Sequence, residues 1–225
     1  MTEGDALENQ YDLGRDCLKV IAIITMTIDH VGAFLYPEHV VLRIIGRIAF
    51  PIFGYLLILG VESTRDTRAY FLRLIVFAAI SQIPYFLVQG YEPFEVLNIF
   101  FTLAFGVMFL ANSLLLIPVL FASMLVHFDT GLYGIILIAC LRFMRGQTAF
   151  GLVAYVAYSI MLLTVSTIQP FQLLALPLIL LHHLGYLKIT RAVVGKNVYP
   201  TWWKYFFYLY YPLHLTILYL IRVSY

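Results

Sequence analysis

Long apolar runs separated by short polar turns dominate the chain. Val20–Ile28, Ile48–Val61 and Leu132–Leu141 carry no charged side chain. A helix needs about 20 mostly apolar residues to cross the hydrocarbon of a bilayer, within a range of about 17–25. The pattern predicts helices at Leu18–Tyr36, Val40–Val61, Tyr70–Val88, Val96–Ala111, Leu114–His127, Leu132–Met144, Ala149–Ser166, Phe171–His183 and Trp203–Val223.

Three of these segments are short for a membrane span. Leu114–His127, Leu132–Met144 and Phe171–His183 could be re-entrant or buried in the bundle, so eight or ten spans stay open beside nine. No linker is long enough to separate two domains. We therefore expect one transmembrane helical domain over residues 17–225, preceded by a polar cytoplasmic tail over residues 1–16. That tail is acidic, whereas a secretion signal opens with positive charge.

Composition supports an all-α, polytopic membrane bundle. Hydrophobic residues make up 62% of the chain and charged residues 12%, whereas soluble domains hold about 45–50% and about 25%. The net charge of +2 gives no reason to expect a nucleic-acid partner. Cys17 and Cys140 match neither a metal-binding spacing nor a disulfide framework, and no metal is expected. His182-His183 indicates an interfacial pair rather than a metal site, because adjacent helical positions diverge by about 100°.

The distribution of basic residues predicts the orientation. Cytoplasmic connections are enriched in Lys and Arg. With nine spans and a cytoplasmic N-terminus, the outer turns carry Glu38, Glu92, Glu95 and Asp129, and Arg222 is the single outer exception. The inner connections then hold Arg65, Arg68, Arg142, Arg145, Lys188, Arg191, Lys196 and Lys204. This predicts a multi-pass protein of the cytoplasmic membrane with a cytoplasmic N-terminus.

Charged and imidazole side chains gather near the turn between the first two helices. A charge inside a span costs roughly 2.5–3.5 kcal/mol on insertion scales, so it needs a partner or a function. His30 and Arg47 each lie about 9–10 Å below that turn, at a rise of 1.5 Å per residue. Arg43 and Arg47 are four residues apart and share a helix face. Asp29 leaves its helix about 100° from His30, so we expect it to pair with one of these arginines. A purely structural ion pair is the alternative.

Two further polar groups follow from the same topology. Gln82, Asn98, Thr102 and His214 fall at a similar depth and predict, together, a cavity that opens outward, although each alone fits a helix–helix hydrogen bond. Arg65, Arg68 and Arg73 lie at the predicted inner side. Their guanidinium groups are suited to phosphates, although inner-side topology alone also explains such charges.

Several blocks occur in a specific order. They are Ile28–Gly32, Leu42–Phe53, Tyr70–Leu74, Ser81–Pro84, Asn98–Leu103, Lys204–Tyr208 and Tyr211–Leu215. On these blocks the chain resembles the TraX family of membrane proteins, from Leu18 to Ile221. The namesake of that family acetylates the N-terminus of conjugative pilin. The family is similar to the membrane acyltransferases, which pass an acyl group from cytoplasmic acyl-CoA to an acceptor across the membrane.

The resemblance implies roles for particular residues. His30 corresponds to a catalytic histidine of that superfamily, His214 to a late histidine, and the family's arginines to Arg43, Arg47, Arg68 and Arg73. In this reading His30 is a general base, and Arg43 and Arg47, with Asn98 or Gln82, stabilise the oxyanion. Arg65, Arg68 and Arg73 would bind the phosphates of acetyl-CoA, the co-substrate. The acceptor would be an amine or hydroxyl of a protein N-terminus, a glycan or a lipid. Two alternative interpretations are a transporter or flippase and a non-catalytic structural subunit.

Overall fold

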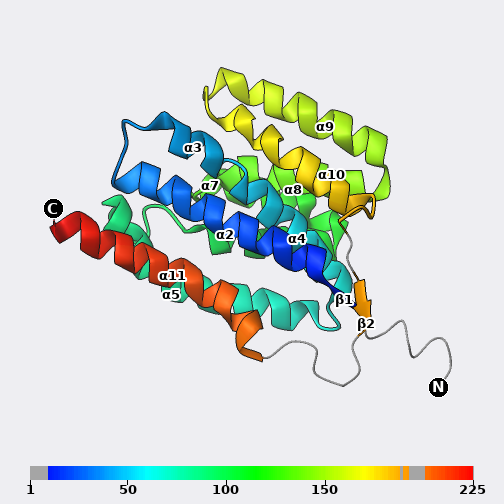
Figure 1. Cartoon of the computed structure of the whole chain (residues 1–225), viewed down its shortest axis with the longest axis horizontal. Helices are drawn as coiled ribbons and strands as arrows, with labels where there is room; N and C mark the ends of the chain where they lie inside the picture. The colour runs from blue at the N-terminus through cyan, green and yellow to red at the C-terminus, as the bar shows by residue number, and fades with distance from the viewer. Residues whose placement is uncertain (1–9, 188–189, 193–200, 225) are drawn as a thin grey trace.

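The structure, a computed structural model, describes residues 10–187, 190–192 and 201–224 as a bundle of helices (Figure 1). Its short strands β1 (Gln10–Asp12) and β2 (Thr190–Ala192) pair antiparallel. The helical elements are α2 (Leu13–Phe34), α3 (Val40–Gly46), α4 (Ala49–Ser63), α5 (Thr67–Gln89), α6 (Ile99–Ala111), η1 (Ser113–Leu115), α7 (Leu116–Leu125), α8 (Gly131–Gly146), α9 (Thr148–Met161), η2 (Leu162–Thr164), η3 (Gln169–Ala175), α10 (Leu176–His183) and α11 (Thr201–Ser224).

The helices are those of a membrane protein. Within the described residues, four segments are long and apolar enough to span a bilayer: Leu13–Phe34, Val40–Ser63, Thr67–Gln89 and Tyr205–Ser224. Shorter apolar helices accompany them, and each of the nine predicted helices has a counterpart. Large apolar side chains cover the outside of the bundle, among them Ile83, Ile117, Val153 and Leu220. A surface of this kind needs hydrocarbon to face, so the predicted membrane helical bundle is confirmed.

The first two predicted helices differ from the structure. The predicted helix Val40–Val61 is interrupted after Gly46, and α4 restarts at Ala49. Pro51 explains the break, because a proline has no N–H to bond the carbonyl of Arg47 four residues earlier. The first helix begins at Leu13 rather than at Leu18. The carboxylate of Asp12 accepts from the amides of Gly14 and Arg15 and so caps α2.

Helix α4 lies at the centre of the bundle. It packs against α2 on one side and α8 on the other, and it also contacts α6, η3 and α10. Its residues Ile52, Tyr55 and Ile58 are completely buried. In Figure 1, α5 and α11 run side by side below α2, while α9 and α10 lie on the opposite side of the bundle. The helices that carry the predicted site, α2 and α3–α4, are thus held from both sides.

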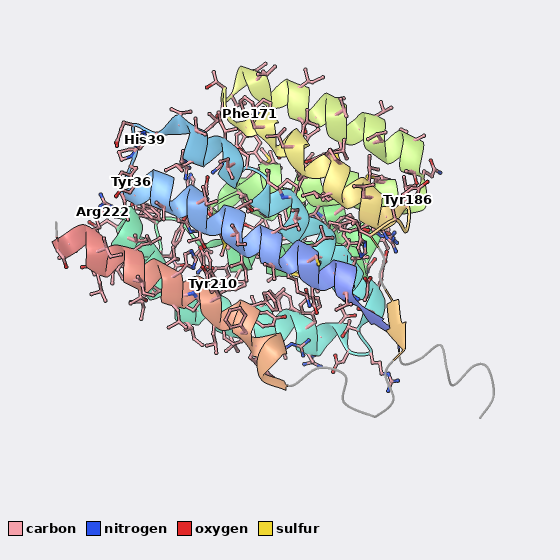
Figure 2. All side chains as sticks on the ribbon, viewed as in Figure 1. Tyr36, His39, Phe171, Tyr186, Tyr210 and Arg222 are labelled. Atoms are coloured by element: carbon pink, nitrogen blue, oxygen red, sulfur yellow. The ribbon has the colours of Figure 1, made fainter. Side chains whose placement is uncertain are left out.

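The bundle has two chemically different ends. We call them the Tyr36 end, at the turn between α2 and α3, and the Asp12 end, at the start of α2. Figure 2 shows Tyr36, His39 and Arg222 at one end and Tyr186 at the other. At the Asp12 end, Glu62 forms ion pairs with Arg142 and Arg145, and Asp12 bonds His182. Lys188 and Lys196, two of the predicted inner basic residues, lie outside the described residues, as does the start of the predicted polar tail.

Candidate active site

A single carboxylate holds two guanidinium groups where α2 meets α3. Arg43 Nη1 donates to Asp29 Oδ2 at 2.8 Å and to the Asp29 carbonyl at 3.0 Å. Arg47 Nη2 donates to Asp29 Oδ1 at 2.5 Å. The Asp29 side chain is only 13% exposed, so the pair is largely shielded from water. Asp29 therefore binds both arginines rather than one of them, so two positive charges face one negative charge.

Two glycines permit this close approach of α2 and α3. A Cβ on Gly46 would lie 2.1 Å from Asp29 Oδ1, and a Cβ on Gly32 would lie 2.7 Å from the Cβ of Leu42. Real Cβ atoms essentially never come within 3.0 Å of another atom. The absence of side chains at these two positions is thus what lets the Asp29 carboxylate reach both arginines.

His30 lies beside this ion pair and bonds a second histidine. Its Nδ1 is 2.7 Å from Nε2 of His214 on α11, and the two ring planes differ by 6°. The rings of Phe34 and Tyr211 flank His30 at centroid distances of 5.6 and 6.2 Å. His214 is 6% exposed. The first and last helices of the bundle therefore meet at a direct contact between two imidazoles.

A cavity of about 350 Å³ brings the predicted catalytic residues together. Asp29, His30, Arg43 and Arg47 all line it. Phe34 and Gln89 line the part towards the Tyr36 end, and Met26 and Phe207 line the deep part. No group of three His, Cys, Asp or Glu in the described part of the chain could hold a metal ion. The chemistry available in this cavity is that of an imidazole, two guanidinium groups and carboxylates.

Gln82, Asn98 and Thr102 lie outside the lining of this cavity. The Asn98 amide donates to Gln82 Oε1 at 2.8 Å and to the Ala78 carbonyl at 2.7 Å, and Gln82 donates to the Val96 carbonyl at 2.8 Å. These bonds join α5 to the start of α6. Thr102 is 1% exposed and sits behind the cavity wall, against Gly134. His214 also lies behind the wall, where it bonds His30 and packs against Tyr211, which both line the cavity.

The predicted inner arginines are separate from the cavity. Arg65, Arg68 and Arg73 belong to the Asp12 end, and none of the three lines the cavity among the described residues. Arg73 lies with its guanidinium 5.5 Å from the Tyr70 ring centre, and its Nε is buried without a partner among the described residues. One helical turn further on, Phe77 stacks on Tyr208 at 4.9 Å, next to the cavity residue Phe207. A thin layer of aromatic rings therefore lies between the cavity and Arg73.

Several polar residues of the cavity were not expected from the sequence, among them Asp129 and Gln169. Asp129 lies in the α7–α8 connection, which the pattern predicts as an outer turn, yet it lines the cavity. A backbone bridge to Leu97 holds the connection inward, since the Asp129 amide donates to the Leu97 carbonyl at 2.8 Å. Tyr85 donates to Asp129 Oδ1 at 3.2 Å. Gln169 accepts from Arg47 Nη1 at 3.3 Å. The signal at Asp129 was a lone acid between two apolar helices.

Comparison with known families identifies the family of this chain. The model of the family described as "TraX protein" matches residues 14–222, which is nearly the whole chain. This protein belongs to the TraX family. Several of the sequence blocks that carry the resemblance meet at the cavity. Ile28–Gly32, Leu42–Phe53 and Tyr211–Leu215 surround it or support its histidine. Ser81–Pro84 and Asn98–Leu103 build the α5–α6 contact, and Asn98–Leu103 also adds apolar side chains to the cavity lining.

Two curated relatives extend the comparison. A protein of Dichelobacter nodosus named as a probable fimbrial assembly protein, FimC of serogroup H1, is 26% identical over 89% of this chain and 92% of its own length. An uncharacterised protein of Rickettsia prowazekii (strain Madrid E) is 44% identical over 31% of this chain, a match that spans 26% of that protein. No solved structure matches the chain. The printed name of the Dichelobacter nodosus relative refers to fimbrial assembly.

Proposed function

We propose that this TraX family protein is a membrane acyltransferase that moves an acetyl group from acetyl-CoA to an amine or hydroxyl acceptor. The observation that carries the proposal is the shared cavity of His30, Arg43 and Arg47 inside a membrane bundle. An imidazole beside fixed positive charge is what acyl transfer requires, because one group must take a proton while the other stabilises a developing oxyanion.

In the proposed reaction His30 acts as the base. Its Nδ1 is occupied by His214, so Nε2 is the atom that can take the proton of the acceptor amine or hydroxyl. The acceptor then attacks the thioester carbonyl, and the tetrahedral intermediate collapses by breaking the C–S bond. The proton on Nε2 passes to the departing CoA sulfur. The base returns to its neutral form, and no covalent enzyme intermediate is needed.

Arg43 is best placed to stabilise the oxyanion. Only its Nη1 is used by Asp29, and Nε and Nη2 make no hydrogen bond within the described part of the chain. Arg47, by contrast, donates to Asp29, Gln169 and the Arg43 carbonyl. We therefore assign Arg43 to the oxyanion, and Arg47 to holding Asp29 in place. Preorganised charge of this kind is worth about 10²–10³ in kcat where single donors have been removed.

Acetyl-CoA would approach from the Asp12 end. Arg65, Arg68 and Arg73 are the proposed phosphate ligands, and the buried, unpartnered Nε of Arg73 is the best placed of their donors. The pantetheine arm would pass the ring layer at Phe207 and Tyr208 to reach the cavity. With the Asp12 end in the cytoplasm, this route takes the donor from the cytoplasmic side of the cell membrane. The acceptor would then enter from the Tyr36 end.

The named relative points to the class of acceptor. The Dichelobacter nodosus protein is named for fimbrial assembly, which favours an amine of an exported pilus or fimbrial subunit over a glycan or lipid. Asp129 in the cavity supports this choice, because a carboxylate attracts a protonated amine. The ammonium group then releases one proton to water, and His30 takes the second proton as the neutral amine attacks the thioester.

Titration of the purified protein with CoA, followed by turnover of acetyl-CoA, tests the proposal. We expect His30→Ala to bind CoA like wild type and to lower thiol release by at least about 100-fold, the usual contribution of a general base. We expect Arg73→Ala to weaken CoA binding by about tenfold, because a hydrogen bond to a charged group is worth about 1.5–3 kcal/mol.

Matched control variants distinguish these roles from a general loss of folding or stability. His39→Ala removes an exposed histidine at the Tyr36 end, and Arg142→Ala removes an arginine whose contact with Glu62 is a loose 4.0 Å. Both should behave like wild type. The acyltransferase assignment fails if the wild-type protein binds no CoA, or if His30→Ala turns over acetyl-CoA as fast as His39→Ala does.

A further inference from the structure

A chain of three hydrogen-bonding groups ends at His30. The Tyr210 carbonyl lies 2.9 Å from Nδ1 of His214, and Nε2 of His214 lies 2.7 Å from Nδ1 of His30. A carbonyl oxygen can only accept a hydrogen bond, so Nδ1 of His214 must carry the proton. A neutral imidazole holds one N–H, which leaves Nε2 of His214 as an acceptor. The proton between the two rings therefore belongs to Nδ1 of His30.

The surroundings hold the two rings in this arrangement. The Tyr210 ring stacks on His214 with centroids 5.1 Å apart and planes 16° apart. Tyr211 packs against both histidines, at 5.5 Å from His214 and 6.2 Å from His30. His214 is buried and does not line the cavity. Rotation of either ring would break the bond between the histidines.

Charge around the pair favours two neutral rings. Arg43 and Arg47 stand near His30, and Asp29 and Asp129 balance them within the cavity wall. A second proton on the histidine pair in the resting protein would add a positive charge that none of these four groups offsets. Placing an unpaired charge in a buried site costs free energy, because the charge loses its hydration.

We infer that His214 is a positioning residue that fixes His30 as the Nδ1–H tautomer, with the lone pair of Nε2 facing the cavity. When Nε2 takes the proton of the acceptor, the Nδ1–H bond to His214 stabilises the imidazolium. The same proton then leaves Nε2 for the CoA sulfur, so His214 neither gains nor loses a proton. The role in catalysis rests on the proposed acyltransferase function, whereas the tautomer itself does not.

Nitrogen-15 spectroscopy reads the tautomer directly. The full-length protein is labelled with ¹⁵N-histidine and measured in detergent at neutral pH, and the His30 signals are assigned by their loss in His30→Ala. We expect a protonated Nδ1 and an unprotonated Nε2 on His30 in the wild-type protein. His214→Gln keeps an acceptor oxygen near the position of Nε2 and should preserve this tautomer, whereas His214→Phe should yield a mixture. Finding Nε2 of wild-type His30 protonated overturns the inference.

Turnover then tests what the tautomer does. We expect His214→Phe to lower kcat for acetyl-CoA by about 10- to 100-fold, with KM unchanged. Loss of the hydrogen-bond partner of a metal-binding histidine has an effect of this size. His214→Gln should recover most of that loss. Thr27→Val removes another bond between α2 and α11, from Thr27 to the Tyr210 hydroxyl at 2.7 Å, and is the control for helix association.

The outcomes separate the two proposals. Equal activity of the Phe and Gln variants, with His30 keeping its tautomer in both, overturns the positioning role. A wild-type protein that has the Nδ1–H tautomer but does not turn over acetyl-CoA refutes the acyltransferase proposal and leaves the assigned tautomer intact. If His214→Phe does not fold, the wild-type and His214→Gln spectra still decide the tautomer.

Discussion

Replacing Gly46 with alanine tests whether the contact between α2 and α3 is as close as the site requires. The new Cβ would lie 2.1 Å from Asp29 Oδ1, 2.2 Å from its Cβ and 2.4 Å from its Cγ. The carboxylate cannot turn away freely, because Arg43 and Arg47 hold both of its oxygens. The two helices must therefore separate by more than about 1 Å to bring these atoms to the 3.4 Å of ordinary van der Waals contact.

The expected cost combines overpacking with a weakened ion pair. Inserting an extra carbon into a packed interior costs about 1–3 kcal/mol. Stretching the bonds from Asp29 to two arginines adds to this, so we expect about 2–4 kcal/mol in total. For a chain of this size each kcal/mol corresponds to about 2–4 °C in Tm, which predicts a Tm lower by at least about 4 °C. A displacement near 1 Å at a catalytic group also predicts about a 100-fold loss of acetyl-CoA turnover.

Thermal unfolding in detergent, followed by circular dichroism, measures this effect against Gly146→Ala. A Cβ on Gly146, at the end of α8, meets no described atom within 4 Å. Alanine there should leave Tm unchanged or raise it slightly, because alanine is favoured over glycine in helices by about 0.5–1 kcal/mol. If Gly46→Ala melts at the same temperature as Gly146→Ala and keeps its turnover, the close approach of Gly46 to Asp29 does not exist in the protein.

Two further predictions address residues on either side of the cavity wall. Asn98→Ala should lower the free energy of unfolding by about 2 kcal/mol, because it removes the cap of α6 and two bonds to α5. Turnover per folded molecule should not change. A loss of turnover in a variant with the Tm of wild type would show that Asn98 takes part in the reaction. Asp129→Asn should raise the KM for a peptide with a free α-amine by about tenfold without altering the affinity for CoA, because it removes a charge-assisted contact with the amine. If acetyl transfer gives the same KM for the variant and the wild type, Asp129 has no role in acceptor binding.

The apolar pattern predicts the elements of this protein well because short connections with turn-forming or polar residues, such as those around Pro37 and Asp129, separate the apolar runs. Span length alone does not explain this agreement, since four of the described segments are long enough to cross a bilayer. Nine helices were expected and each has a counterpart, with the break before Pro51 as the main difference. The ion pair was also predictable. Arg43 and Arg47 are one turn apart, and a tight turn forces their helix against α2, so Asp29 had few other partners within reach.

Which residues line the cavity was less predictable, because the depth of a residue in the membrane does not determine the direction in which its side chain points. Gln82 and Asn98 fall at the expected level but face each other across the α5–α6 contact. Asp129 was assigned to an outer turn, and only the backbone bridge to Leu97 carries it into the cavity. Helices that are apolar on every side give no periodic signal for their inner face.

The amino-acid sequence alone determined that this chain is a helical membrane protein of the TraX family and that His30, Asp29, Arg43 and Arg47 meet near one turn. Tertiary structure alone decided that His214 bonds His30, that Asp129 shares their cavity, and that Arg73 stands apart from it. The physical reason is the separation along the sequence between the interacting residues. Helix length and i,i+4 spacing are local properties, whereas the pairing of α2 with α11 depends on which packed arrangement of all the helices has the lowest free energy.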